Sequence, residues 1–191
     1  MLILIGASAS GKTEIAKILI HDFGFQKMVT TTTRRKRKGE VNHVDYHFVT
    51  EGKFIKMKEQ NKFLETVQYN NNYYGTPKEG ATIDKVLIVE PEGANEIYKQ
   101  GIEDAVFILL ETDEETRKDR MLSRGDNLIQ VLDRLHRDDE YFDEKNLVHI
   151  DYKMNTSTLN QYDLASVIND LYQKHLKQIK RWEFLIVFYV C

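Results

Sequence analysis

Short runs of apolar residues alternate with longer amphipathic segments along the chain. The runs at 1–5, 86–89 and 105–110 are continuously apolar, which is typical of strands buried on both faces of a parallel sheet. A further strand is expected over 148–154. Apolar residues at helical spacing predict helices over about 13–23, 91–100, 113–123, 128–142 and 160–180. Strands that alternate with helices predict an α/β fold, a three-layer α/β/α domain with a parallel central sheet.

The segment between residues 50 and 77 has a different pattern. Thr50 can cap a helix that ends near residue 60. Residues 63–69 and 73–74 flank a run of asparagines, which predicts a strand, a turn and a second strand. These elements are short, polar and antiparallel, so we expect a small insertion packed beside the main sheet. The inward-facing residues of its helix are expected to be Phe54, Ile55 and Met57.

Composition and charge narrow the class of protein. The 191 residues fit one domain, and 27 Lys and Arg against 30 Asp and Glu give a net charge of −3, which argues against nucleic acid as a partner. Cys191 is the sole cysteine, which excludes a disulfide scaffold and a cysteine-ligated zinc site. No apolar run reaches the roughly 18 residues of a membrane span, and residues 1–5 lack the basic leader of a secretory signal. We therefore expect a cytoplasmic protein with no membrane partner.

A glycine-bearing loop follows the first strand and opens the first helix. Residues 6–13 match the pattern G-x-x-x-x-G-K-S/T in full, and this strand–loop–helix context is the one that the motif requires. Glycines let backbone N–H groups turn inward around phosphate oxygens, and the helix N-terminus adds partial positive charge. Lys12 would reach the β- and γ-phosphates of ATP, and Thr13 would offer its hydroxyl to Mg²⁺. The alternative is a glycine turn with an accidental lysine. The expected ATP ligands are Gly6, Ala7, Ser8, Ala9, Ser10, Gly11, Lys12 and Thr13.

A basic run at 34–38 follows four consecutive threonines at 30–33. An isolated run of this kind is more often a solvated face or a nucleic-acid patch. Next to a phosphate-binding loop, hydroxyls and arginines instead favour a cradle for a monophosphate, because guanidinium groups match phosphate oxygens with two parallel hydrogen bonds.

Four segments carry a resemblance to a known family. Residues 32–42, with Thr32-Thr33-Arg34 and Gly39-Glu40, and residues 45–49 are similar to the pattern T-T-R…R-x-G-E…D-Y-x-F-V. Residues 63–65 and 72–76 are similar to F-I/L-E…N-Y-Y-G-S/T. Together with the phosphate-binding loop, these motifs resemble the guanylate kinase family in order and spacing across residues 1–80.

The resemblance implies a division of the chain. The family has a P-loop kinase fold with a small mixed β/α GMP-binding insertion and a helical lid. Transferred to this sequence, the core is expected at about 1–33, 77–123 and 143–180. The GMP-binding subdomain is expected at about 34–76 and the lid at about 124–142.

The resemblance also implies a GMP site. Glu65, Thr76 and Glu90 would recognise the base, and this assignment has a chemical reason. Guanine presents its N1–H and 2-amino donors side by side, so one carboxylate can accept hydrogen bonds from both. Adenine lacks this pair of donors and would place an acceptor nitrogen against the carboxylate. The alternatives are a surface charge for Glu65 and ordinary strand packing for the tyrosines. The residues expected to hold the GMP phosphate are Thr30, Arg34, Arg37, Tyr46 and Tyr74.

One position departs from the family pattern. The family places two acids, two residues apart, at the end of the strand over 86–90, and this chain has Ile88 at the first position and Glu90 at the second. Glu90 is therefore the sole local carboxylate, and we assign it to guanine. Turnover is expected to be lower than with the usual pattern.

Arginines at 117–137 resemble the family's lid. By this resemblance, Arg120 and Arg134 would contact phosphates and join Lys12 and Arg34 as catalytic residues, while Arg124 and Asn155 would contact ATP. The alternative for each arginine is a solvated helix face.

The expected reaction is in-line transfer of the ATP γ-phosphoryl group to GMP or dGMP, by a monomer or homodimer. A nucleoside monophosphate has a second pKa near 6, so no catalytic base is needed, and His43 and His47 are interpreted as non-ligands. Other possibilities are a non-catalytic guanylate-kinase-like binding module and a related small-molecule kinase of the same fold. Lys12 argues against the former, and Glu65 against the latter. The apolar run at 184–191 could be a last strand, an oligomer contact or a reading-frame artefact.

Overall fold

The protein, in a computed structural model, is described for residues 1–69 and 71–189, with the side chains of 69 and 180–189 excepted. Its main sheet has the strand order β2-β7-β1-β8-β9, and neighbouring strands pair in parallel. β1 therefore lies inside the sheet, between β7 and β8, where both of its faces are covered. The strands are β1 (Leu2–Ile5), β2 (Gln26–Lys27), β7 (Lys85–Ile88), β8 (Val106–Glu111) and β9 (Tyr152–Asn155).

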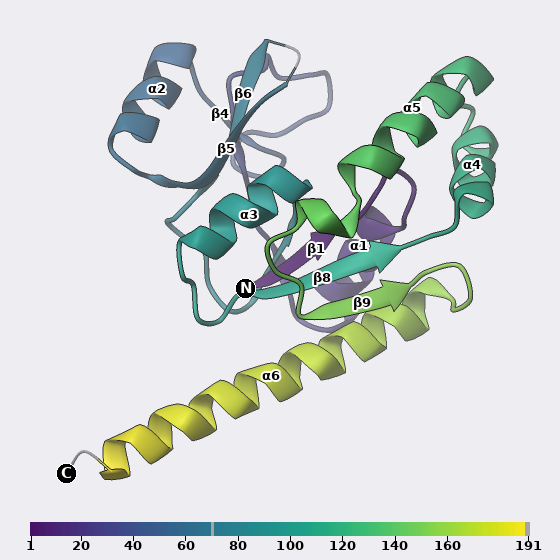
Figure 1. The fold of residues 1–191 in the computed structure, drawn as a ribbon. Helices are drawn as coiled ribbons and strands as arrows, with labels where there is room; N and C mark the ends of the chain where they lie inside the picture. The colour runs from purple at the N-terminus through teal and green to yellow at the C-terminus, as the bar shows by residue number, and fades with distance from the viewer. Residues whose placement is uncertain (70, 190–191) are drawn as a thin grey trace.

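Helices cover both faces of this sheet, which confirms the predicted three layers (Figure 1). Successive side chains of a strand point to opposite faces, and β1 follows this rule. Leu2 and Leu4 pack with residues of α1 (Lys12–Asp22) and α6 (Gln161–Tyr189). Ile3 packs on the other face with residues of α3 (Pro91–Lys99). The β1 carboxyl end thereby points the following loop toward one edge of the sheet.

A second, mixed sheet with strand order β4-β3-β6-β5 lies beside the first (Figure 1). Thr50 caps the adjoining helix by accepting a hydrogen bond from the Lys53 N–H, as the sequence predicts. From that helix, Phe54 stacks on Phe63 and Tyr73. The elements are β3 (Thr31–Thr32), β4 (His47–Phe48), α2 (Glu51–Glu59), β5 (Phe63–Tyr69) and β6 (Asn72–Pro77).

Two further helices, α4 (Glu114–Ser123) and α5 (Leu128–Tyr141), form an antiparallel pair above the carboxyl ends of β1 and β8 (Figure 1). Met121 of α4 packs with Val131 and Leu135 of α5 in a small core of their own, and Ala9 of the phosphate-binding loop packs against it. This contact couples the position of the helix pair to that loop.

Three predictions of side-chain burial or strand position are wrong. Ile55 is exposed, since α2 turns only Phe54 fully inward. Ile88 is 38% exposed because it is the last residue of β7 and lines the cavity described below. β9 begins at Tyr152 rather than at 148, and Val148 is 61% exposed in the preceding loop.

At the carboxyl end, α6 continues past the expected residue 180 to Tyr189. The helical backbone over 184–189 excludes a last strand there. The side chains of 184–189, and residues 190–191, lie outside the described part of the chain. Among the described residues, no helix combines the length and apolarity needed to cross a membrane.

Candidate active site

The loop between β1 and α1 has the strained backbone of an anion-binding turn. Gly6 has φ +154°, and a Cβ atom there would lie 2.5 Å from the Leu110 carbonyl oxygen. Gly11, which precedes α1, has φ +95°, and Ala9 has φ +61°. A side chain is excluded at Gly6 by contact and disfavoured at Gly11 by conformation. The loop therefore needs glycine at the two positions where the motif has it.

Lys12 extends back over this loop. Its ammonium group donates hydrogen bonds to the carbonyl oxygens of Gly6 and, at 2.7 Å, of Ala7. Burial lowers the pKa of Lys12 from its ordinary 10.5 to about 8, and the carboxylates of Asp138 and Glu90 act in the opposite direction. A cation held over inward-turned N–H groups is suited to bind a polyphosphate.

Arg120 and Thr156 hold the backbone of this loop in place through hydrogen bonds to its carbonyl oxygens. Arg120 donates from Nη1 to the Ala9 carbonyl oxygen at 3.1 Å and from Nη2 to the Thr156 carbonyl oxygen at 2.9 Å. The buried Thr156 hydroxyl donates to the Ser10 carbonyl oxygen at 3.0 Å. Thr156 was not expected from the sequence, because its contact spans 146 residues.

One cavity of about 880 Å³ joins this loop to the second sheet. Its walls come from the loop, the second sheet, the β7–α3 junction and α5. They include the Lys12 ammonium group at the loop and the Glu65 carboxylate at the second sheet. The cavity can therefore bind an anionic group at one end and hydrogen-bond donors at the other. The expected site residues among its lining are Ser8, Lys12, Thr30, Tyr46, Glu65, Tyr74, Thr76, Glu90 and Arg134.

At the second sheet, Glu65 and Thr76 form a buried pair. The Thr76 hydroxyl donates to Glu65 Oε1 at 2.6 Å, and their backbones are partners in the pairing of β5 with β6. Burial raises the pKa of the Glu65 carboxyl, and the Thr76 hydrogen bond opposes this effect. Glu90 lines the same cavity as the residue before α3, where its side chain caps no N–H group and has the Tyr141 hydroxyl as a hydrogen-bond partner. Both carboxylates are therefore placed to accept hydrogen bonds from a ligand.

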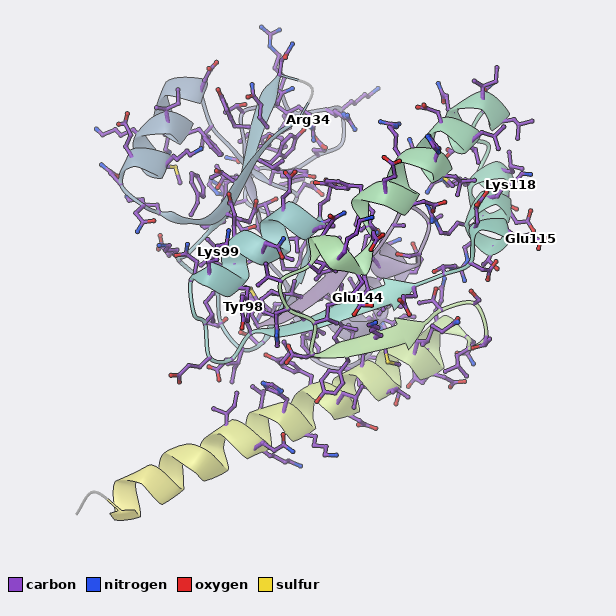
Figure 2. All side chains as sticks on the ribbon, viewed as in Figure 1. Arg34, Tyr98, Lys99, Glu115, Lys118 and Glu144 are labelled. Atoms are coloured by element: carbon purple, nitrogen blue, oxygen red, sulfur yellow. The ribbon has the colours of Figure 1, made fainter. Side chains whose placement is uncertain are left out.

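Arg34, which follows β3, lies on the side of the second sheet (Figure 2). Its guanidinium forms a two-point ion pair with Glu40, Nη2 to Oε1 at 2.6 Å and Nη1 to Oε2 at 3.1 Å. The guanidinium also lies over the Tyr46 ring, 5.4 Å from its centroid. Tyr46 meets Tyr74 edge to face with ring centroids 6.2 Å apart. The motif thus brings a cation together with two phenols, of which the phenols line the cavity and Arg34 lies directly behind Tyr46.

Four further expected residues do not line the cavity, namely Thr13, Arg37, Arg124 and Asn155. Arg37 is exposed, and its backbone N–H donates to Glu40. Arg124 pairs with Asp126, and the Asn155 side chain accepts a hydrogen bond from the Ser157 N–H. Thr13 is exposed at the start of α1. Arg134, which lines the cavity, also reaches Asp126, at 3.5 Å.

The two histidines of the basic segment contact each other. The Nδ1 atoms of His43 and His47 are 2.8 Å apart. Among the described residues, no group of three or more His, Cys, Asp or Glu side chains is arranged to hold a metal ion.

From α4 and α5, the sequence predicts Arg120 and Arg134 as site residues and Arg117 only as one of the lid arginines, and it gives no indication of Asp138 or Tyr141. Arg117, Asp138 and Tyr141 come from these helices and surround the loop or the cavity. Tyr141 has a raised pKa, caused first by burial and then by the nearby carboxylates of Glu90 and Glu92. The sequence shows Asp138 and Tyr141 only as members of an amphipathic helix, without a motif.

Comparison with known proteins agrees with this geometry. A family model described as guanylate kinase matches residues 1–182. Over 132 residues, the chain is 38% identical to the guanylate kinase of Clostridioides difficile strain 630, a match that covers 65% of this chain and 64% of that protein, just under two thirds of its length. It is 33% identical over 172 residues to the guanylate kinase of Prochlorococcus marinus strain MIT 9312, with 85% of each chain covered.

A solved structure has the same fold. The crystal structure of guanylate kinase from Anaplasma phagocytophilum matches with a TM-score of 0.60 at 22% identity, covering 91% of this chain and 85% of that chain. At this identity, the likeness concerns the fold alone.

Proposed function

The chain belongs to the guanylate kinase family, and on that premise we propose that it transfers the γ-phosphoryl group of ATP to GMP or dGMP. The observation that carries the proposal is the single cavity that contains both Lys12 and Glu65. A phosphoryl transfer between two nucleotides requires a polyphosphate site and a base-recognition site that open to each other, and the presence of Lys12 and Glu65 in one cavity supports that arrangement.

The donor would bind at the phosphate-binding loop. Lys12 and the loop N–H groups would hold the β- and γ-phosphates, and Arg120 keeps the loop in shape from below. Mg²⁺ fits this side, since the exposed Thr13 hydroxyl is an oxygen ligand of the kind it prefers. When bound, Mg²⁺ would neutralise charge on the phosphates.

The acceptor would bind against the second sheet. Thr76 orients the Glu65 carboxylate, which would accept from the guanine N1–H and 2-amino group. Glu90 would add a second acceptor. Arg34, Tyr46 and Tyr74 would hold the GMP phosphate at the other end of the cavity. We assign the acceptor subdomain to about 34–76, although β3 at 31–32 also pairs in this sheet, and the lid to about 124–142.

Catalysis would consist of placing two anions in line and compensating their repulsion. The acceptor phosphate is already largely ionised at pH 7 because its second pKa is near 6. No side chain is needed to remove a proton from it. Lys12, Arg34 and Arg134 would supply positive charge around the transferring group, and α5 would exclude water from the cavity.

The test is ADP formation from MgATP with each of GMP, dGMP, AMP, CMP, UMP and dTMP. We expect turnover with the guanine nucleotides alone. Binding of GMP without turnover with any acceptor would contradict the proposal in favour of a nucleotide-binding module. Turnover with another acceptor, and none with GMP, would instead indicate a related kinase.

A further inference from the structure

A carboxylate of this chain occupies the phosphate-binding loop. The backbone N–H of Ser8, in the middle of the loop, donates to Asp138 Oδ2 at 2.6 Å, although the two residues are 130 positions apart. Asp138 lies in the last turns of α5, and its side chain is only 13% exposed. Asp138 therefore differs from Asp133 and Asp139 of the same helix, whose side chains are 66% and 51% exposed.

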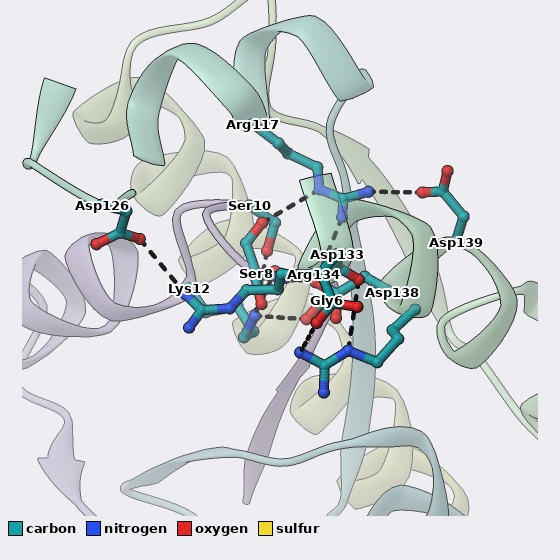
Figure 3. Close-up of polar contacts among 12 residues, drawn as sticks. Gly6, Ser8, Ser10, Lys12, Arg117, Asp126, Asp133, Arg134, Asp138 and Asp139 are labelled. Carbon is teal, nitrogen blue, oxygen red and sulfur yellow. Dashed lines mark hydrogen bonds and ion pairs between the residues drawn. The ribbon is translucent and has the colours of Figure 1, made fainter. Parts of the chain in front are cut away.

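Arg117 of α4 fixes this carboxylate (Figure 3). Its guanidinium, 6% exposed, reaches Asp138 Oδ2 from Nη2 at 3.3 Å and Asp139 Oδ1 from Nη1 at 3.0 Å. Its Nε donates to the Ser8 carbonyl oxygen at 3.2 Å. Glu115 and Lys118, by contrast, lie on the outer side of α4 (Figure 2). Arg117 thus joins both helices to Ser8, and each polar atom of the Ser8 backbone has a partner from them.

In this contact, the Asp138 carboxylate binds where the loop would bind a phosphate group. Loop N–H groups before a helix N-terminus bind negatively charged oxygens, and a carboxylate oxygen satisfies the same donor as a phosphate oxygen. The two cannot accept from the Ser8 N–H at once in the same direction. Asp138 also shares the cavity with Lys12, so a second anion entering there meets its negative charge.

We infer that Asp138 is a donor-site residue that occupies the loop in the nucleotide-free chain and is displaced by the terminal phosphate of the donor. The inference rests on the proposed function in taking that donor to be ATP. Displacement releases the Ser8 N–H to the phosphate and frees the end of α5 from the loop. Asp139 remains as a partner for Arg117, so the buried guanidinium is not left uncompensated.

The experiment measures dissociation constants by calorimetry, without GMP, for MgATP and for inorganic triphosphate. The variants are Asp138→Ala, Asp138→Asn and the matched control Asp133→Ala, whose carboxylate is 66% exposed on the same helix and pairs with Arg137. Removing the competing carboxylate should tighten binding of both probes about tenfold, the range of one charge-assisted hydrogen bond. Asp138→Asn should give about a threefold gain, because an amide oxygen still accepts from Ser8 without its charge. GMP affinity and the control should remain at the wild-type value.

An unchanged or weaker affinity of Asp138→Ala for triphosphate overturns the inference, since a carboxylate that merely stabilises α5 would not compete. Thermal unfolding of each free variant identifies loss of the fold, and in that case the Asn variant decides. The two proposals fail separately. Tighter triphosphate binding without ADP formation from GMP upholds the role of Asp138 and overturns the kinase activity. ADP formation with unaltered triphosphate affinity does the reverse.

Discussion

The Thr76 hydroxyl donates a 2.6 Å hydrogen bond to Glu65 Oε1, and both side chains are buried. A carboxylate in this environment carries its charge at an energetic penalty, which is why burial raises the pKa of Glu65. One hydroxyl does not replace the hydration of an ionised carboxyl. The position is thus less stable in the free protein than a neutral residue would be, and this is the arrangement expected where a ligand supplies the missing donors.

Glu65→Gln should therefore make the free protein more stable and, at the same time, reduce its selectivity for guanine. A raised carboxyl pKa means that stability is lost as pH rises through that pKa, so a neutral amide at pH 7 should raise the melting temperature of the free protein by about 2–4 °C, equivalent to about 1 kcal/mol. Because the amide cannot accept from both guanine donors, kcat/KM for GMP should fall about a hundredfold or more. Calorimetric unfolding and steady-state kinetics measure the two effects.

The control for this substitution is Glu59→Gln, an exposed acid at the end of α2. It should change neither quantity. A Glu65→Gln protein that melts lower than the wild type, or that retains its preference for guanine, would contradict the assignment of Glu65 to base recognition.

Because Glu40 holds the Arg34 guanidinium in place, we expect loss of the Glu40 charge to weaken binding of the acceptor GMP. Two hydrogen bonds from Glu40 and the ring of Tyr46 fix the guanidinium plane, and a fixed plane loses less entropy on binding phosphate. Glu40→Gln should raise KM for GMP about tenfold, the value of one charge-assisted hydrogen bond, with kcat little changed. Glu14→Gln, which removes an exposed ion pair to Lys17, is the control. A fall in kcat alone would place Glu40 outside acceptor binding.

Lys12 predicts a pH dependence of donor binding. Its pKa of about 8 means that the free protein is protonated there at pH 7 and loses the proton as pH rises through 8, whereas bound phosphate favours the ammonium form. The dissociation constant for MgATP should therefore increase above pH 8, by up to about tenfold per pH unit. Calorimetry from pH 6.5 to 9.5 measures this. Lys12→Met should bind weakly at every pH, and a wild-type profile that is flat to pH 9.5 would contradict the low pKa.

The main sheet could be predicted from the sequence because β1 and β8 are continuous apolar runs, as strands buried on both faces are, and loops exposed to water do not contain such runs. The strands that were missed have no such pattern. Gln26 and Lys27 of β2 are exposed at the sheet edge, and Thr31 and Thr32 of β3 are buried although polar. Two-residue strands of this kind depend on their partners, so tertiary context decides them.

The site residues, like the strands, fall into those that a local sequence pattern predicts and those that depend on tertiary packing. The two glycines and the lysine of the phosphate-binding loop, and Glu65 and Tyr74 of the second sheet, have local motifs, and the structure brings Lys12, Glu65 and Tyr74 to one cavity. The Ser8–Asp138 contact has no local signal, because it depends on how α5 packs over the loop through Leu135 and Ala9. The pattern of α5 predicts which face is apolar but not which acid reaches the loop.

Ile88 gives the last prediction. It is paired with Leu4 at the end of β7, is 38% exposed, and lines the cavity that holds Lys12. An apolar side chain there offers no oxygen to a hydrated cation beside the phosphates. Ile88→Asp should therefore lower the Mg²⁺ concentration for half-maximal rate and raise kcat about three- to tenfold. Ile88→Asn has nearly the same shape as the Asp variant without its charge, and we expect it to match the wild type. Equal rates for the Asp and Asn variants would show that the acid is not what limits turnover, because only the charge distinguishes them.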